Sequence, residues 1–173
     1  MATGDQPEPE SAQRMFRTLS DFISDITGGH RETEAFDAND YRLAAAALLV
    51  HVISIDGAVT DDERTVLKQI LASRFGLDAA ESEALVELAI ARDAEAVDLY
   101  AFTSVLNRAL DDEGRRRIVE MMFEVAYADG GLSEFEDNLV WRAAELLNVG
   151  SRDRIRIRRE VRDETDAGGD GQD

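Results

Sequence analysis

The stretch that decides the fold is written twice in this chain. Residues 41–63 read YRLAAAALLVHVISIDGAVTDDE, and residues 118–136 read IVEMMFEVAYADGGLSEFE. Each copy is an apolar run that ends in the pattern D-G-x-[V/L]-[T/S]-x-x-E, and a second helix-like run follows it. An apolar run, a turn and another helix, repeated once, predict two helical hairpins packed about a pseudo-twofold axis.

The first apolar run and the composition together predict an all-α protein. Nearly every side chain in residues 41–55 is apolar, as in a helix that is buried on all sides. The 173 residues include only two prolines, 44% are hydrophobic, and the period-2 alternation typical of strands is scarce. We therefore expect one compact bundle of about seven to eight helices, with repeat halves at about 41–75 and 114–148.

The regions outside the repeat divide the chain further. Residues 1–10 are predicted to be a disordered tail, and 11–39 an amphipathic helix with a polar linker. The helical domain is expected over 40–163, followed by a second disordered tail at 164–173. Within the domain, helices are expected near 79–91, with Asp78 and Asp93 as cap or linker acids, and near 95–109. The inward residues of the second are expected to be Val97, Tyr100, Ala101, Val105 and Leu106. An arginine-rich last helix is expected to begin at Ser151 and to pair with the acidic body.

Charge and composition exclude several classes of partner. The formal net charge of −18 repels nucleic acid and anionic membrane surfaces, and it favours cations or basic protein surfaces. Cysteine is absent, which removes disulfides and thiolate metal sites. The acidic N-terminus is unlike a signal peptide, and the longest apolar run, 43–50, falls far short of the ~20 residues of a membrane span. We expect a cytoplasmic protein with no transmembrane segment.

Helix capping explains most of the repeated turn. Thr60 and Ser133 stand at N-cap positions, with Glu63 and Glu136 three residues later, which is the spacing of a capping box. In that motif the hydroxyl and the carboxylate each bind a backbone N–H that the helix leaves without a partner. Capping thus accounts for the two glutamates first, with metal binding as the alternative.

Asp56 and Asp129 are the residues that local geometry leaves unexplained. An acid at the C-terminal end of a helix opposes the helix dipole. If both turns lie at one end of the bundle, the two aspartates and neighbouring acids would form an anionic pocket that needs a cation or an arginine, such as one from 115–117. Oxygen ligands suit Ca²⁺, Mg²⁺ or Mn²⁺, although the spacing rules out an EF-hand.

His51 and Glu124 occupy equivalent positions in the two copies. Both are polar residues on otherwise apolar helices. A histidine on a buried helix is usually a hydrogen-bonded core residue, and a buried glutamate needs a partner. We place both as second-tier metal ligands behind the acidic turns.

The repeated stretches resemble the TerB (tellurite-resistance B) family. Its signature is a helix ending in A-x-A-D-G, a turn, and S-x-x-E, and residues 125–136, VAYADGGLSEFE, match it closely. The resemblance covers about 41–149 and points to the single-domain branch. It implies an all-α fold of pseudo-twofold helix pairs, a link to tellurite and other stress responses, and scaffolding near the membrane. It also implies divalent-metal binding by acids that match by position, namely Asp56, Glu63, Asp129 and Glu136.

Two departures and three hypotheses follow from the resemblance. The first copy has Ser54-Ile55 before its aspartate, and it has His51 where an acid is common. The leading hypothesis is a non-enzymatic stress-response module that binds a divalent cation and has protein partners. The second is a metal-free helical module for protein interaction or scaffolding. The third, a metal-dependent hydrolase, lacks an identifiable base or substrate pocket.

Overall fold

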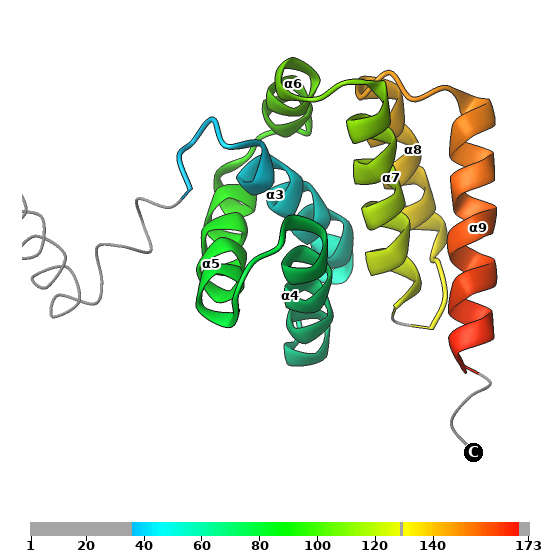
Figure 1. The fold of residues 1–173 in the computed structure, drawn as a ribbon, viewed down its shortest axis with the longest axis horizontal. Helices are drawn as coiled ribbons and strands as arrows, with labels where there is room; N and C mark the ends of the chain where they lie inside the picture. Colours follow the sequence, from blue (N-terminus) through cyan, green and yellow to red (C-terminus); the bar gives the residue numbers. More distant parts are fainter. Residues whose placement is uncertain (1–35, 129, 170–173) are drawn as a thin grey trace, which may run out of the picture. The chain divides into compact units, whose positions relative to one another are not determined.

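The computed structural model describes residues 36–128 and 130–169. The predicted N-terminal tail, the amphipathic helix and the linker up to residue 35 lie outside the described residues, as do Asp129 and residues 170–173. The described part forms α-helices and one 3-10 turn and contains no strand (Figure 1). The elements are α3 (Tyr41–Ile53), η1 (Ser54–Asp56), α4 (Asp61–Phe75), α5 (Ala79–Glu95), α6 (Tyr100–Ala109), α7 (Asp112–Tyr127), α8 (Glu134–Leu146) and α9 (Ser151–Gly169).

Helix α3 is the centre of the bundle, as its apolar sequence predicts. Every residue from Leu43 to Val50 is buried, and α3 contacts α4, α5, α6, α7 and α8. The alanines at 44–47 are short enough for neighbouring helices to pack close to the α3 backbone. Each buried leucine or valine on this helix stabilises the fold by roughly 1.5–3 kcal/mol relative to exposure.

The two repeated hairpins are α3–η1–α4 and α7–α8. They meet through α3 and α7, and α4 also contacts α7. In Figure 1, α7, α8 and α9 stand side by side, α5 lies on the other side of α3 from them, and α4 overlaps α3 and extends below it. Helix α9 packs on α7. The all-α bundle with two helical hairpins is thus confirmed.

Helix α5 runs past its predicted end, and this changes which residues of the next segment are buried. The helix continues to Glu95, so Asp93 lies inside it and does not cap a helix. The chain then enters α6 with Leu99 buried, while Val97 is 98% exposed and Tyr100 is 66% exposed. The inward prediction is therefore wrong for Val97, Tyr100 and the exposed Ala101, and it is confirmed for Leu106, which is buried, and for Val105, which packs against the core.

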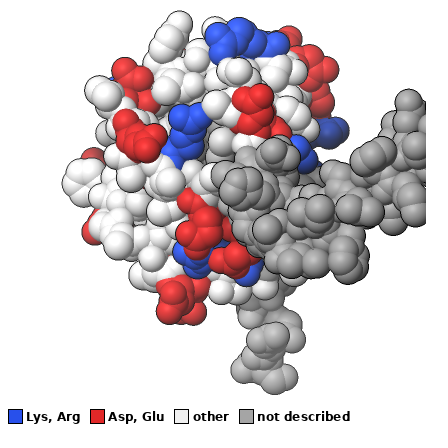
Figure 2. Space-filling model, turned by 90° about the vertical axis from the view of Figure 1, so that its left-hand side faces the viewer, with Lys and Arg blue, Asp and Glu red and all other residues white. Residues whose placement is uncertain are grey.

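Helix α9 is joined to the body by one ion pair of the predicted kind and by one of the opposite polarity. Arg158 of α9 lies 3.4 Å from Asp137 on α8, whereas Asp153 of α9 lies 3.6 Å from Arg116 on α7. Helix α9 continues to Gly169, beyond the predicted end near Asp163. On the face in Figure 2, acidic and basic groups are interspersed with broad uncharged areas, so this face is not uniformly acidic.

Candidate functional site

The first turn ends α3 and starts α4 through a capping box. The backbone N–H of Thr60 donates to Glu63 Oε2 at 2.7 Å, and the N–H of Glu63 donates to Thr60 Oγ1 at 3.3 Å. Gly57 has φ 144°, a backbone conformation that favours glycine, and it lets the chain leave η1. The predicted capping role of Thr60 and Glu63 is confirmed.

The second turn repeats this geometry between α7 and α8. The N–H of Ser133 donates to Glu136 Oε2 at 2.8 Å, and the N–H of Glu136 donates to Ser133 Oγ at 3.2 Å. Gly130 has φ 93°. Glu136 is only 8% exposed, whereas Glu63 is half-buried. The second copy therefore holds its carboxylate deeper in the fold than the first.

A small cavity lies between the two turns and brings their glutamates together. It encloses about 50 Å³ and is lined from both hairpins. Three acids line it, Asp62 and Glu63 from α4 and Glu136 from α8, and its described lining contains no lysine or arginine. In each capping box Oε2 is the oxygen that binds the backbone, and Oε1 has no hydrogen-bond partner among residues 36–128 and 130–169. Both free oxygens therefore belong to carboxylates at one cavity.

The other predicted ligands at the turns are placed differently. Asp56 ends η1 and is exposed to solvent, and it is not among the residues that line the cavity. Asp129 lies outside the described residues. Within the ranges 36–128 and 130–169, no group of three or more His, Asp or Glu residues is arranged to hold a metal ion. The described donors at the cavity are thus few, and a bound cation there would keep several water ligands.

His51 is engaged by a carboxylate on α5. Its Nδ1 lies 2.6 Å from Asp93 Oδ1, and Ser54 Oγ donates to Asp93 Oδ2 at 3.1 Å. The side chain of Asp93 is 12% exposed. These contacts join the C-terminal end of α3 to the last turns of α5, and they leave the second-tier ligand role of His51 a prediction.

Glu124, the equivalent of His51 in the second copy, forms an ion pair with Arg74 across the two hairpins. Arg74 also contacts Glu120 at 2.9 Å. Burial raises the pKa of the Glu124 carboxyl, and the hydrogen bond and charge of Arg74 offset only part of that effect. The Glu124 carboxylate is thus paired with the Arg74 guanidinium, and its role as a metal ligand stays a prediction.

Sequence reasoning missed two carboxylates that matter here. Asp62 lines the shared cavity, and its signal was its place in the acidic first turn of α4, next to Glu63. Asp93 was expected to cap or link helices, but it binds His51 and Ser54. Arg115, Arg116 and Arg117 pair with Asp112, Glu113 and Asp153, so they do not neutralise the cavity.

Comparison with known proteins assigns the family. The family described as "Tellurite resistance protein TerB" matches residues 42–159, which include both hairpins and the first half of α9. No curated protein and no solved structure matches the chain. None of the helices in the described part has both the length and the apolar character needed to cross a membrane. Because the match covers well over half of the sequence and both repeated turns, the chain belongs to the TerB family of tellurite resistance proteins.

Proposed function

We propose that this chain is a non-enzymatic TerB-family module that binds one partly hydrated divalent cation at the cavity between its two Asp-Gly turns. The observation that carries the proposal is that Glu63 and Glu136, which belong to different hairpins, line the same cavity together with Asp62. Carboxylates that share a cavity repel one another unless a positive charge lies between them. The described lining supplies no cationic side chain, so a bound cation would relieve the repulsion.

The chemistry of the donors favours a hard cation. All the charged donors at the cavity are carboxylate oxygens, which Mg²⁺, Mn²⁺ and Ca²⁺ prefer. Mg²⁺ commonly binds through one or two carboxylates and keeps several waters, and this suits a cavity of about 50 Å³ with two glutamates. Asp56 precedes α4 by a few residues and would add negative charge to the first turn. Its contribution is electrostatic in this proposal.

A cation at this place would join the two hairpins. Glu63 is fixed at the start of α4 and Glu136 at the start of α8, each by its own capping hydrogen bonds. A ligand that bound both carboxylates would stabilise the arrangement in which the hairpins meet. The module would then present a metal-dependent surface to its protein partners in a stress-response assembly.

A metal-free interaction module is the second candidate, and one observation favours it. Ile55 in η1 and Phe135 in the first turn of α8 are 39% and 69% exposed. Large apolar side chains beside both turns are a feature of protein-binding surfaces. In this alternative the glutamates serve only as helix caps.

A titration followed by calorimetry tests the proposal. Mg²⁺, Mn²⁺ and Ca²⁺ are added to the wild type, to Glu63→Gln/Glu136→Gln, and to Asp56→Asn/Asp129→Asn. Glutamine keeps the capping hydrogen bond and removes the charge, so the glutamine variants separate metal binding from capping. Glu81→Gln is the matched control, since Glu81 closes a capping box with Asp78 on α5, away from the cavity.

The two candidate functions predict different heats. Cation binding predicts a single site in the wild type and in Glu81→Gln, weakened at least tenfold in Glu63→Gln/Glu136→Gln and less in the aspartate pair. An absence of heat for all three cations at two temperatures, with no change in thermal stability, contradicts the proposal and leaves the metal-free module.

A further inference from the structure

A second cavity lies between α3, α5 and α6. It encloses about 250 Å³, and none of its lining residues belongs to the two turns. Leu43 and Ala44 of α3 form one wall, and Phe102 and Val105 of α6 form another. The cavity is therefore mostly apolar, and its walls from α5 and α6 lie outside the repeat.

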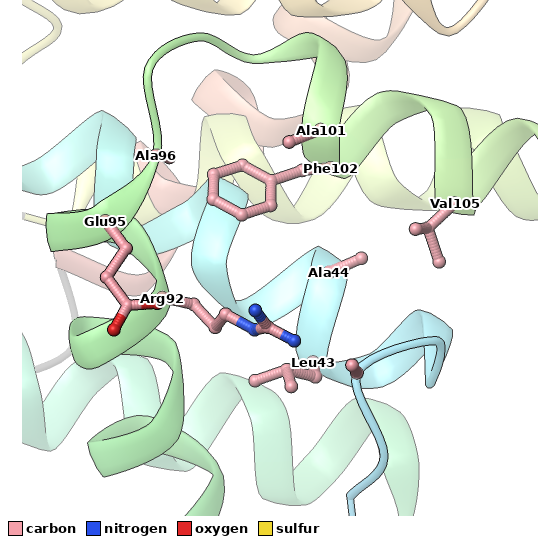
Figure 3. A pocket seen from close by; sticks show the side chains of 9 residues that line it. Leu43, Ala44, Arg92, Glu95, Ala96, Ala101, Phe102 and Val105 are labelled. Carbon is pink, nitrogen blue, oxygen red and sulfur yellow. The ribbon is translucent and has the colours of Figure 1, made fainter.

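One cationic group reaches into this apolar space. Arg92 extends from α5 across the cavity toward α3, and its guanidinium lies near Leu43 and Ala44 (Figure 3). Glu95, one turn later on α5, also lines the cavity, and in the same view its carboxylate lies beside the α5 end of the Arg92 side chain while the guanidinium extends toward α3. Arg92 has no ion-pair or hydrogen-bond partner among residues 36–128 and 130–169, although most other arginines of the bundle are paired. A half-buried guanidinium in an apolar cavity calls for an anion.

We propose that this cavity binds a small monocarboxylate with a compact apolar body, whose carboxylate pairs with Arg92. The guanidinium presents several N–H donors in a plane, which match the two oxygens of a carboxylate. The side chains of Leu43, Ala44, Phe102 and Val105 would bury the apolar body. This site is independent of the cation proposed at the turns.

The size of the cavity sets the size of the ligand. At roughly 30 Å³ for each water in the liquid, 250 Å³ corresponds to about eight water-sized groups. A six-carbon carboxylate such as hexanoate has about that many non-hydrogen atoms. Most drug-sized ligands occupy cavities of about 300–1,000 Å³, so larger molecules fit less well.

Hexanoate is the probe for the test, with hexanol as its uncharged counterpart. Each is titrated into the full chain at about 0.15 M salt, where the Debye length of ~8 Å limits repulsion by the net negative charge. Binding is followed by the chemical shifts of backbone amides. We expect saturable shifts for residues of α3, α5 and α6 that line the cavity, with hexanoate bound at least tenfold more tightly than hexanol.

Three variants assign the binding to the cavity and to Arg92. Arg92→Gln is expected to weaken hexanoate at least tenfold and to leave hexanol within about twofold. Ala101→Leu, at an exposed position of the lining, narrows the cavity and weakens both probes. Arg108→Gln, at an exposed arginine of α6 outside the cavity, is the matched control and leaves both affinities unchanged.

Several results would overturn this inference. Equal affinity for hexanoate and hexanol would show that no charge is recognised. Unchanged hexanoate binding by Arg92→Gln, with the fold verified by its denaturation curve, would remove Arg92 from the site. Chemical-shift changes that cluster away from α3, α5 and α6 would show that hexanoate binds elsewhere. No change at a hexanoate concentration that would saturate a site of millimolar affinity would show that the cavity binds no such ligand.

Discussion

Glu63 and Glu136 start different helices of different hairpins, yet their carboxylates line one cavity. Each uses Oε2 to hold the backbone N–H of its own N-cap residue. Each glutamate therefore caps its own helix, and the tertiary fold also places both at one cavity where a cation could bind. Substitutions that keep the hydrogen bond but remove the charge separate capping from cation binding.

Two substitutions at Glu136 are expected to separate the capping hydrogen bond from the effect of the negative charge on stability. Glu136→Ala removes an acceptor for the Ser133 N–H and is expected to lower the free energy of unfolding by about 1 kcal/mol, a typical value for a lost cap. Glu136→Gln retains the acceptor and, without added cation, is expected to lie within about 0.5 kcal/mol of the wild type or above it, because like charges repel at the cavity. Urea denaturation in the presence of a chelator measures both. Equal loss in the two variants would contradict the account.

Helix caps were the part of the candidate site that the sequence could predict. The pairs Thr60–Glu63 and Ser133–Glu136 are three residues apart, so local geometry alone determines their hydrogen bonds. The same locality explains the left-handed backbone of Gly76 and Asn148, just after the ends of α4 and α8. The buried central helix was also predictable, because a run without a polar face can only be covered on all sides.

Contacts between distant helices could not be predicted in this way. His51 and Asp93 are 42 positions apart and belong to α3 and α5, so only the packing angle of those helices brings them together. The place of Asp62 at the cavity depends in the same way on the face that α4 turns toward α7. Val97 was assigned inward from helical periodicity, but it lies in a loop where that period does not apply.

Asp93 is expected to stabilise the junction of α3 and α5. Asp93→Ala removes the partner of both His51 Nδ1 and Ser54 Oγ and should lower the free energy of unfolding by roughly 1–3 kcal/mol. Asp93→Asn keeps one oxygen acceptor and should lose less. Chemical denaturation of the two variants is the measurement. If alanine and asparagine cost the same, the hydrogen bonds to Asp93 are not the cause.

Glu124 gives the stability a defined pH dependence. Its folded-state pKa is raised by burial, so the folded chain holds this proton to higher pH than the unfolded chain does. The stability that Glu124 contributes is then fully present below its unfolded-state pKa and is lost as pH rises through the folded-state value. The free energy of unfolding of the wild type, minus that of Glu124→Gln, should fall as the pH rises above the ordinary glutamate value of about 4.3. A difference that grows with pH would contradict this assignment.

Leu49 on α3 tests whether the central helix supports the whole bundle. Its side chain is fully buried, and Leu49→Ala is expected to lower the free energy of unfolding by about 2–5 kcal/mol. Ile55→Ala, in the exposed η1 turn next to the end of the same helix, should cost much less. Thermal and urea denaturation compare the two. A smaller loss for Leu49→Ala than for Ile55→Ala would contradict the central role of α3.

Paramagnetic broadening by Mn²⁺ tests most directly whether the two turns form one cation site. Backbone amide signals of the isotopically labelled chain are recorded while Mn²⁺ is added below one equivalent. The account predicts that amides of 60–63 and 133–136 lose intensity together, that the capping box at 78–81 does not, and that Glu63→Gln/Glu136→Gln abolishes the effect. Broadening at only one turn, or the same broadening at 78–81 as at the two turns, would contradict a shared site.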